Sequence, residues 1–178
     1  MKHNILITEV EIRSSIIDLA LKIDKHYDDL NINRLSVIVL MDGAFVFASD
    51  LVRKLNISTD LIFIGAKSYG DAFTPKGDVE ITICDKKKGL SIIENTHVLI
   101  VDDIYDTGNT ITEVKNVISS SINTLSIKTC CFLCKNNTSV RNLDFYAQDI
   151  DKSQFVYGYG LDLFGRYRDL PDVCVYDK

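Results

Sequence analysis

The sequence predicts an α/β domain with a mostly parallel, twisted sheet that is flanked by helices. Two observations lead to this prediction: short, nearly all-apolar runs recur along the chain, and stretches with apolar residues at helical spacing alternate with them. Strands buried on both faces are continuous apolar runs, and their alternation with helices implies a parallel sheet. A length of 178 residues, 46% hydrophobic and 25% charged, fits one globular domain.

The first helix and strand are predicted from the N-terminal third of the chain. Thr8 followed by Glu11 fits a capping box, and apolar residues then recur at helical spacing, so a helix is expected over about residues 8–26. The run LSVIVLM at 35–41 predicts a strand that is buried on both faces. An apolar stripe at 44–55 is typical of a second helix.

The remaining elements continue the same alternation. The stretch SYGDAFTPKG at 68–77 carries turn residues over a length that is often a functional loop. Residues 79–84 alternate between apolar and polar side chains, as one arm of an antiparallel pair does. Further strands are expected at 61–65, 98–101, 127–133, 155–158 and 173–176, and a helix at 111–119.

Charge and composition exclude several classes of function. The net charge of −5 and the pI near 5.1 argue against broad nucleic-acid binding, which needs clustered Lys and Arg. The one dense basic run, at 86–88, is interpreted as a solvated turn. The sequence predicts neither a membrane span nor a secretory signal. We therefore expect a cytoplasmic protein that binds neither membranes nor nucleic acid.

The five cysteines have no regular framework spacing, which favours reduced, buried thiols over disulfides. Cys131 and Cys134 form a CxxC inside an apolar run that predicts a strand. Alternation along a strand would direct these two side chains to opposite faces. Neither a zinc site nor a redox pair is therefore expected.

The stretch VLIVDDIYDTGNT at 98–110 gives the strongest functional signal. Asp102 and Asp103 follow an apolar strand, and ligands bind outside the carboxyl ends of parallel strands. Two adjacent carboxylates there can accept hydrogen bonds from vicinal hydroxyls or support Mg²⁺, which prefers oxygen ligands. Capping of the next helix explains one acid, but adjacent acids repel unless something positive binds to them. Ligand binding is therefore favoured over capping alone.

The residues that follow these acids predict an anion site. Asp106, Thr107, Gly108, Asn109 and Thr110 lead into the next helix, so their backbone amides lie at a helix N-terminus. Free amides, the helix dipole and two threonine hydroxyls suit a phosphate monoester. Receiver domains of response regulators have a similar acidic run, but at the start of the chain and without the DTGNT extension. The receiver alternative is therefore disfavoured.

The whole stretch resembles the phosphoribosyl-diphosphate signature of type I phosphoribosyltransferases, and other motifs resemble the hypoxanthine-guanine branch of that family. These motifs are MDGAFVFASDL at 41–51, KSYGD at 67–71, FLCK at 132–135 and FVYGYGLDLFGRYRDLPDV at 155–173. The resemblance spans nearly the full chain. It implies a single domain over residues 1–178, with a core at about 30–140 and a small hood formed by about 1–15 and 141–178.

The resemblance also implies a reaction in purine salvage. A ribose 5-phosphate unit would pass from phosphoribosyl diphosphate to hypoxanthine or guanine, with xanthine as a further candidate base. The products would be IMP or GMP and pyrophosphate, and Mg²⁺ would be required. Because relatives are dimers or tetramers, a homodimer or homotetramer is expected.

Roles for the acidic stretch follow from the same resemblance. Asp102 and Asp103 would hold the ribose hydroxyls and contribute to the Mg²⁺ site. The loop from Asp106 to Thr110 would hold the 5-phosphate. Asp106 would also be the general acid/base beside the purine imidazole nitrogen, a role that a carboxylate can fulfil when burial tunes its pKa.

Four further residues are expected at the purine by resemblance. Lys135 would donate to the 6-oxo group and so reject adenine, whereas a lone lysine at a strand end would otherwise extend to water. Phe155 would stack on the base and Val156 would contact its exocyclic edge through the backbone; without the family match, both would be interpreted as core residues. Asp162 would reach the base region and Mg²⁺, directly or through water.

The pyrophosphate is expected at a turn and a guanidinium. In the family, the turn matching Asp42 and Gly43 binds pyrophosphate through its backbone amides, often with a cis peptide. Arg168 would bind the same group, which suits its planar fork of donors. Ser68 and Tyr69 match the tip of a mobile loop that closes over the reacting centre and excludes water.

Departures from the family pattern leave base preference open, and a relative specialised for one 6-oxopurine is a rival prediction. The departures are Asp42, Asn136-Asn137, Gln148 and Leu163. Two other classes of protein are compatible with the same fold. An RNA-binding pyrimidine attenuation protein on the same fold is disfavoured by the acidic pI. A protein that keeps the fold without catalysis is disfavoured because every predicted catalytic and binding side chain is present.

Overall fold

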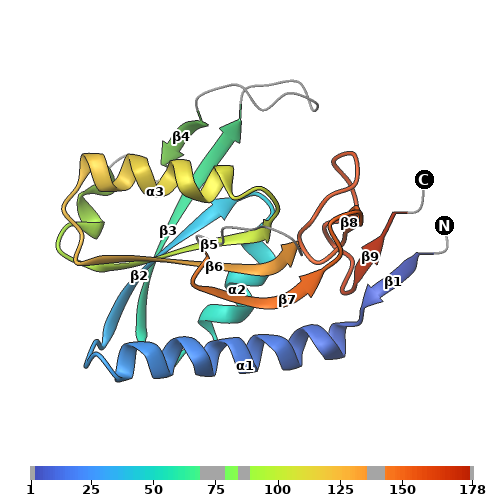
Figure 1. Ribbon diagram of the computed structural model, residues 1–178, viewed down its shortest axis with the longest axis horizontal. Coiled ribbons are helices and arrows are strands. Elements are labelled where there is room, and N and C mark those ends of the chain that lie inside the picture. The colour runs from blue at the N-terminus through green and yellow to red at the C-terminus, as the bar shows by residue number, and fades with distance from the viewer. Residues whose placement is uncertain (1–2, 69–78, 84–88, 136–142, 177–178) are drawn as a thin grey trace.

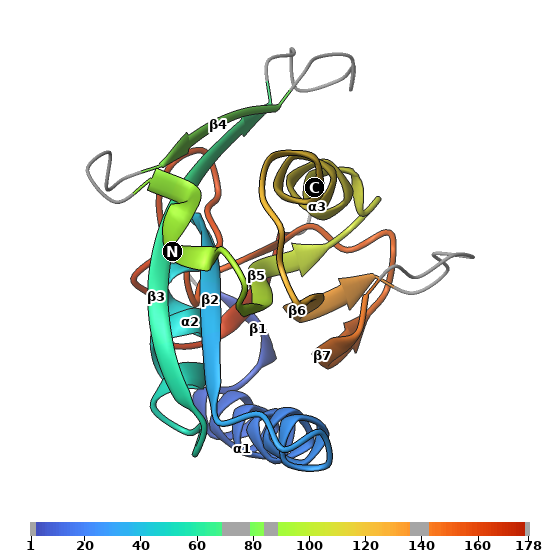
Figure 2. The same ribbon diagram turned by 90° about the vertical axis from the view of Figure 1, so that its left-hand side faces the viewer.

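The computed structural model describes residues 3–68, 79–83, 89–135 and 143–176 (Figure 1). Its central sheet has six strands in the order β4 (Val79–Ile83), β3 (Ser58–Ser68), β2 (Arg34–Met41), β5 (His97–Tyr105), β6 (Ser126–Lys135) and β7 (Phe145–Ile150). Helices α1 (Glu9–Asp28) and α2 (Phe45–Val52) cover one face, and α3 (Asn109–Ser121) covers the other (Figures 1 and 2). A short 3₁₀ helix, η1 (Gly89–Ile93), precedes β5.

Five of the six strands run parallel, which confirms the predicted fold class. In the middle of the sheet, Val39 of β2 lies between Phe63 of β3 and Val101 of β5. Strand β4 pairs antiparallel with β3, as its alternating sequence predicted. Strands β2 and β5 lie between the helical layers on both sides, and this explains why their apolar runs are continuous.

Helix α1 begins where the sequence places its capping box. The Glu11 amide donates to the Thr8 hydroxyl, and the Thr8 amide donates to the Glu11 carboxylate at 2.8 Å. The helix extends two residues beyond its predicted end at 26. Its buried stripe packs under the sheet and consists of Ile12, Ile16, Leu19, Ala20, Ile23 and Tyr27.

A buried carboxylate of α1 accepts hydrogen bonds from the loop that follows α2. Asp24 is only 6% exposed, and its carboxylate accepts hydrogen bonds from the Asn56 amide and side chain, each at 3.0 Å. The Ile57 amide also donates to Asp24, at 3.3 Å. These bonds satisfy the buried charge, which would otherwise destabilise the fold. The connection between α2 and β3 is thereby held against α1.

A second, three-stranded sheet forms the hood beside the main sheet (Figure 1). In it, β9 (Val173–Val175) lies between β1 (Asn4–Ile7) and β8 (Val156–Tyr157), and both pairings are antiparallel. The expected boundaries of the hood differ from this arrangement. Helix α1 begins at Glu9 and packs on the main sheet, and β7 pairs with β6 in the main sheet, so neither belongs to the hood.

The expectation that Cys131 and Cys134 face opposite sides of the sheet was wrong. Both thiols are buried in the hydrophobic cluster on the α3 side. Phe132 and Leu133 between them both pack on the α1 and α2 side, so the alternation along β6 breaks at this pair. Among the described cysteines, Cys130, Cys131, Cys134 and Cys174 are buried thiols that are not joined in disulfides, as predicted; Cys84 lies outside the described residues.

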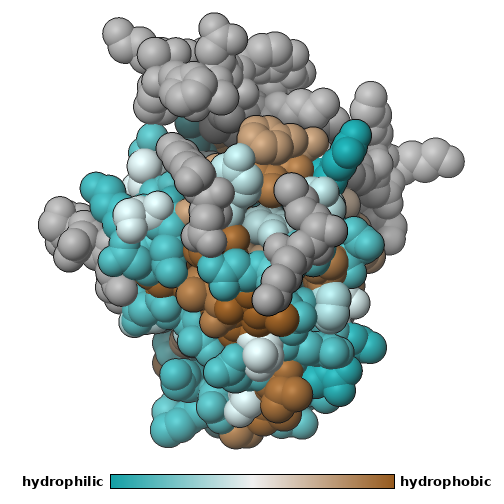
Figure 3. All heavy atoms as spheres, turned by 90° about the vertical axis from the view of Figure 1, so that its right-hand side faces the viewer, coloured by the Kyte–Doolittle hydropathy of each residue, from teal (hydrophilic) through white to brown (hydrophobic). Residues whose placement is uncertain are grey.

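The hood end of the molecule presents apolar groups among polar ones. Apolar side chains gather near the middle of this face (Figure 3). Large apolar side chains of hood residues that remain exposed include Ile5, Phe155 and Phe164. Within the described part of the chain, no helix is long and apolar enough to span a membrane.

Candidate active site

A cavity of about 300 Å³ opens where β2 and β5 end. The acids and small residues of the 98–110 stretch form most of its wall, and two charged residues of the hood complete it. The cavity therefore brings together residues of three motifs that are far apart in the sequence: Met41, Gly43, Asp102, Asp103, Ile104, Tyr105, Asp106, Thr107, Gly108, Asn109, Thr110, Asp162 and Arg168.

The adjacent acids lie within β5, which extends to Tyr105, four residues beyond its predicted end. Both side chains are partly buried. The Asp103 amide donates to Asp102 Oδ1 at 3.0 Å, and the Ile104 amide donates to Asp103 Oδ1 at 2.7 Å. Burial, together with the charge of Asp103, raises the pKa of Asp102 well above its ordinary value. Burial also raises the pKa of Asp103, while the Ile104 amide and Arg168 act against that rise.

Asp103 packs against the turn after β2. A Cβ atom on Gly43 would lie 1.7 Å from Asp103 Oδ2, so only a glycine fits there without displacing the carboxylate. The Met41–Asp42 peptide in the same turn is cis. Met41 and Gly43 line the cavity, whereas the structure does not place Asp42 in its wall. The turn is thus present at the acids, with its backbone rather than the Asp42 side chain facing them.

The anion loop, residues 106–110, leads into α3 as its sequence predicted. Gly108 is the N-cap of α3 with φ 79°, and no side chain caps the helix there. A Cβ on Gly108 would lie 2.3 Å from the Tyr105 hydroxyl, so the loop folds tightly over that ring. The Asn109 amide makes a long bond, 3.4 Å, to the Thr107 hydroxyl. Capping by Asp106 or Thr107 therefore does not account for this sequence, and the first turn is open to an anion.

Lys135 and Asp106 form an ion pair at the edge of the cavity. Lys135 Nζ donates to Asp106 Oδ2 at 2.9 Å. The lysine side chain is 14% exposed, while the Asp106 side chain is 52% exposed. The lysine therefore does not extend into water at the end of β6. It brings a cation to the carboxylate that the sequence predicts as general acid/base.

Two hood residues complete the opposite wall. Arg168 donates through Nη1 to the Gly160 carbonyl at 2.7 Å and pairs through Nη2 with Asp162 Oδ1 at 2.8 Å. Asp162 Oδ2 also accepts a hydrogen bond from the Gly165 amide at 2.8 Å. These bonds hold the guanidinium at the cavity, where its charge opposes the burial-driven rise in the pKa of Asp103.

Other predicted residues lie outside the cavity wall. Phe155 is 49% exposed and its ring meets Tyr176 edge-on, while Val156 is buried in β8. Ser68 is the last residue of β3, and Tyr69 lies outside the described residues. Their predicted contacts with the base and the reacting centre remain predictions. Asn136-Asn137, expected to influence base preference, also lies outside the described residues.

Sequence reasoning missed two features of the site. Tyr105 supports the anion loop, although its position inside the motif marks it only as part of a strand. Gly160, with φ 95°, approaches the Gly43 carbonyl so closely that a Cβ would lie 2.5 Å from that oxygen. A glycine in a sequence can indicate that another backbone segment packs closely against it. The sequence does not reveal that the segment packed against Gly160 is the turn at Gly43, because the two lie over one hundred residues apart.

The donor set of this cavity fits a magnesium ion that is shared with a substrate. Mg²⁺ binds through one or two carboxylates plus substrate phosphates and keeps several waters. Asp102, Asp103 and Asp162 supply such oxygens, and the raised pKa of the first two reflects buried charge that a cation would stabilise. Within the described residues, no group of three or more metal-binding side chains lies close enough together to hold an ion.

Asp102→Asn is expected to stabilise the free protein. Burial and the charge of Asp103 raise the pKa of Asp102, so folding is penalised once this carboxyl ionises. The penalty is absent below the unfolded-state pKa of about 4 and grows as pH rises through the folded-state pKa. Thermal unfolding should show a higher Tm than the parent at about pH 8, by roughly 2–4 °C per kcal/mol, and no difference at about pH 4. An equal difference at both pH values would mean that packing, not charge, is responsible.

Comparisons with known proteins agree with this geometry. Residues 8–163 match the family described as phosphoribosyl transferase domain. A hypoxanthine phosphoribosyltransferase of Haemophilus influenzae is 34% identical, with 95% of this chain and 93% of that protein covered. A hypoxanthine-guanine phosphoribosyltransferase of Aquifex aeolicus is also 34% identical, with 97% and 93% covered.

The fold gives the same result. A solved hypoxanthine phosphoribosyl transferase of Trypanosoma cruzi superimposes with a TM-score of 0.87 at 32% identity, over 99% of this chain and 93% of the other. The matches to related sequences and to this structure both extend over nearly the full length of the chain. The chain therefore belongs to the phosphoribosyl transferase domain family, within its hypoxanthine-guanine branch.

Proposed function

We propose that this protein transfers the 5-phosphoribosyl group from phosphoribosyl diphosphate to hypoxanthine or guanine, with xanthine as a further base, and releases pyrophosphate. The observation that carries this proposal is the single cavity that joins the two acids of β5, the open N-terminus of α3 and the Arg168–Asp162 pair. A sugar diol, a phosphate and a diphosphate each find suitable partners there. The similarity to enzymes named for this reaction supports it.

The proposal assigns one part of the substrate to each part of the cavity. Asp102 and Asp103 accept hydrogen bonds from the ribose hydroxyls, and the loop from Asp106 to Thr110 binds the 5-phosphate. The pyrophosphate lies between the backbone of the Asp42–Gly43 turn and Arg168. Mg²⁺ neutralises the diphosphate when bound, with Asp102, Asp103 and Asp162 within reach as oxygen ligands.

The purine lies on the side of Lys135 and the hood. In the free protein, Lys135 is held by Asp106. When the base binds, the lysine donates to its 6-oxo oxygen, and Asp106 is released to exchange a proton with the imidazole nitrogen. The exposed ring of Phe155 offers a face on which the base stacks. Adenine has an amino group instead of an acceptor at this position, so Lys135 discriminates against it.

A spectrophotometric assay with a panel of bases tests the proposal. Phosphoribosyl diphosphate and Mg²⁺ are supplied separately with hypoxanthine, guanine, xanthine, adenine or uracil. We expect product from the 6-oxopurines, none from adenine or uracil, and loss of product when a chelator removes Mg²⁺. Equal turnover of adenine would contradict the role of Lys135, and no product from any base would contradict the proposed function.

The RNA-binding alternative has no support from the relatives described above, which carry the names of enzymes.

Assembly into a homodimer or homotetramer, and a cytoplasmic location, remain part of the proposal. Size-exclusion chromatography with light scattering distinguishes the two assemblies from a monomer.

A further inference from the structure

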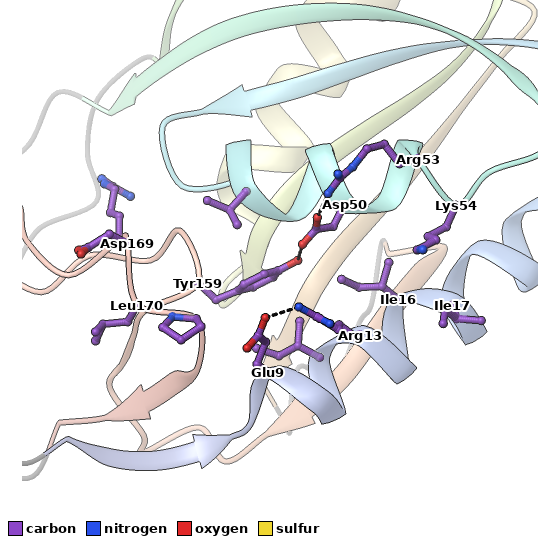
Figure 4. A pocket seen from close by; sticks show the side chains of 14 residues that line it. Glu9, Arg13, Ile16, Ile17, Asp50, Arg53, Lys54, Tyr159, Asp169 and Leu170 are labelled. Atoms are coloured by element: carbon purple, nitrogen blue, oxygen red, sulfur yellow. Dashed lines mark hydrogen bonds and ion pairs between the residues drawn. The ribbon is translucent and has the colours of Figure 1, made fainter.

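A tyrosine of the hood is tied to the helix that follows the proposed pyrophosphate turn. The Tyr159 hydroxyl donates to Asp50 Oδ2 of α2 at 2.7 Å. Figure 4 shows the ring reaching toward that helix from the hood loop, the segment at 158–172 between β8 and β9. Asp50 is also held from its own helix, because Arg53 pairs with Oδ1 of the same carboxylate. Asp50 thus has a fixed orientation when it receives the hydroxyl.

Tyr159 is held in place by its own backbone and ring. Its φ is 50°, in the left-handed region that non-glycine residues rarely adopt. The Tyr159 amide donates to the Leu170 carbonyl at 2.9 Å, and the ring packs on Phe132 of the main sheet with centroids 5.1 Å apart. Burial and Asp50 raise the pKa of the Tyr159 hydroxyl, so it stays protonated and remains the donor.

The next residue connects this anchor to both sides of the proposed pyrophosphate site. A Cβ atom added to Gly160 would lie 2.5 Å from the Gly43 carbonyl oxygen, so the backbone of Gly160 packs directly against the turn. The Gly160 carbonyl accepts the hydrogen bond from Arg168 Nη1 at 2.7 Å. The Gly43 turn and the Arg168 guanidinium therefore both contact the backbone of Gly160. The position of Gly160 depends on Tyr159, the residue that precedes it.

Tyr159 is buried, but protein atoms do not fill the space on one side of its ring. The Tyr159 ring borders a cavity of about 590 Å³ that is lined by residues of α1, α2 and the loop between β8 and β9 (Figure 4). Arg168 also lines this cavity. Where packing is absent, a directional bond determines the position of a side chain. The bond to Asp50 thus restrains the hood loop on its open side.

We propose that Tyr159 and Asp50 are positioning residues that set the spacing between the Gly43 turn and Arg168, and so the affinity for the diphosphate part of the substrate. The inference rests on the proposed function, because that function places pyrophosphate between these two groups. Neither residue lines the cavity where the substrate binds. Their effect is therefore indirect and specific to one part of the ligand.

The test compares two ligands by calorimetry. Phosphoribosyl diphosphate with Mg²⁺ occupies the pyrophosphate site, whereas IMP occupies only the ribose, phosphate and base sites. Tyr159→Phe keeps the ring but removes the hydroxyl, and the Kd for phosphoribosyl diphosphate should rise about tenfold, which corresponds to about 1.4 kcal/mol. The Kd for IMP should not change. Asp50→Ala, which removes the acceptor of the Tyr159 hydroxyl, should act in the same way, and the double variant should be no weaker than the single ones.

Tyr157→Phe is the matched control. Tyr157 is another buried hood tyrosine, but its hydroxyl bonds His3 and its ring packs in the separate hood cluster. It should leave both dissociation constants unchanged. Equal weakening of both ligands by Tyr159→Phe, or no weakening of either, would overturn the inference. A parent protein that binds neither ligand would instead overturn the proposed function.

Discussion

Asp106→Asn should lower turnover by about 10²- to 10⁴-fold, the range expected when a general acid/base is lost. The asparagine side chain has nearly the same shape and still accepts a hydrogen bond from Lys135, whose Nζ lies 2.9 Å from the Asp106 carboxylate. It cannot exchange a proton with the purine nitrogen. Steady-state kinetics with hypoxanthine should therefore show a reduced kcat, while calorimetry should show a nearly unchanged Kd for IMP.

An ion pair elsewhere on the surface serves as the control for Asp106. Asp29 pairs with Lys25 on α1 at 2.8 Å, and both side chains are well exposed. Asp29→Asn removes the same charge from a similar lysine pair, and an exposed pair of this kind is screened by solvent and contributes little to stability. Its turnover should equal that of the parent. Near-normal turnover of Asp106→Asn itself would remove that residue from the general acid/base role.

Gly43→Ala should lower kcat/KM by at least about 10²-fold, because displacing a reactive group by about 1 Å has an effect of that size. The added Cβ would lie 1.7 Å from Asp103 Oδ2 and 2.6 Å from its Cγ, so either the carboxylate or the turn must move. Both are proposed to contact phosphoribosyl diphosphate. We expect the KM for this substrate to rise and kcat to fall, while circular dichroism confirms that the protein remains folded.

The neighbouring position separates a backbone effect from a side-chain effect. Within the described part of the chain, no hydrogen bond or ion pair of the Asp42 side chain is found, and the cavity wall contains Gly43 rather than Asp42. Asp42→Asn should therefore leave kcat/KM close to that of the parent. If Asp42→Asn were as harmful as Gly43→Ala, the idea that the turn acts through its backbone would be refuted.

The central strands could be predicted because burial on both faces leaves a simple signature. Strands β2 and β5 each contain a nearly continuous apolar run, and α1 carries a capping box with a regular apolar stripe. Strand β7 was missed because its sequence FYAQDI mixes polar and apolar residues at a half-exposed sheet edge. Strand β1 was missed because four residues are too few for a period to appear.

The site was predictable where its residues are contiguous, and less so where distant segments meet. The stretch from Asp102 to Thr110 contains its own strand end and helix start, so local chemistry reveals it. The pair between Lys135 and Asp106 and the contact of Gly43 with Asp103 join segments that only the folded sheet brings together. Such contacts depend on strand order, which local patterns do not encode.

The pairing of β1 with β9 affects the order in which the protein forms. Ile5 lies opposite Cys174, so two segments from far ends of the sequence must meet before the hood sheet exists. Closing so long a loop is entropically costly, and contacts of this kind form late in folding. On a ribosome, β1 must wait until β9 has been synthesised. The main sheet and its acidic loop can assemble earlier, so the segment that carries Phe155 and Val156 should be the last to become ordered and the first to open.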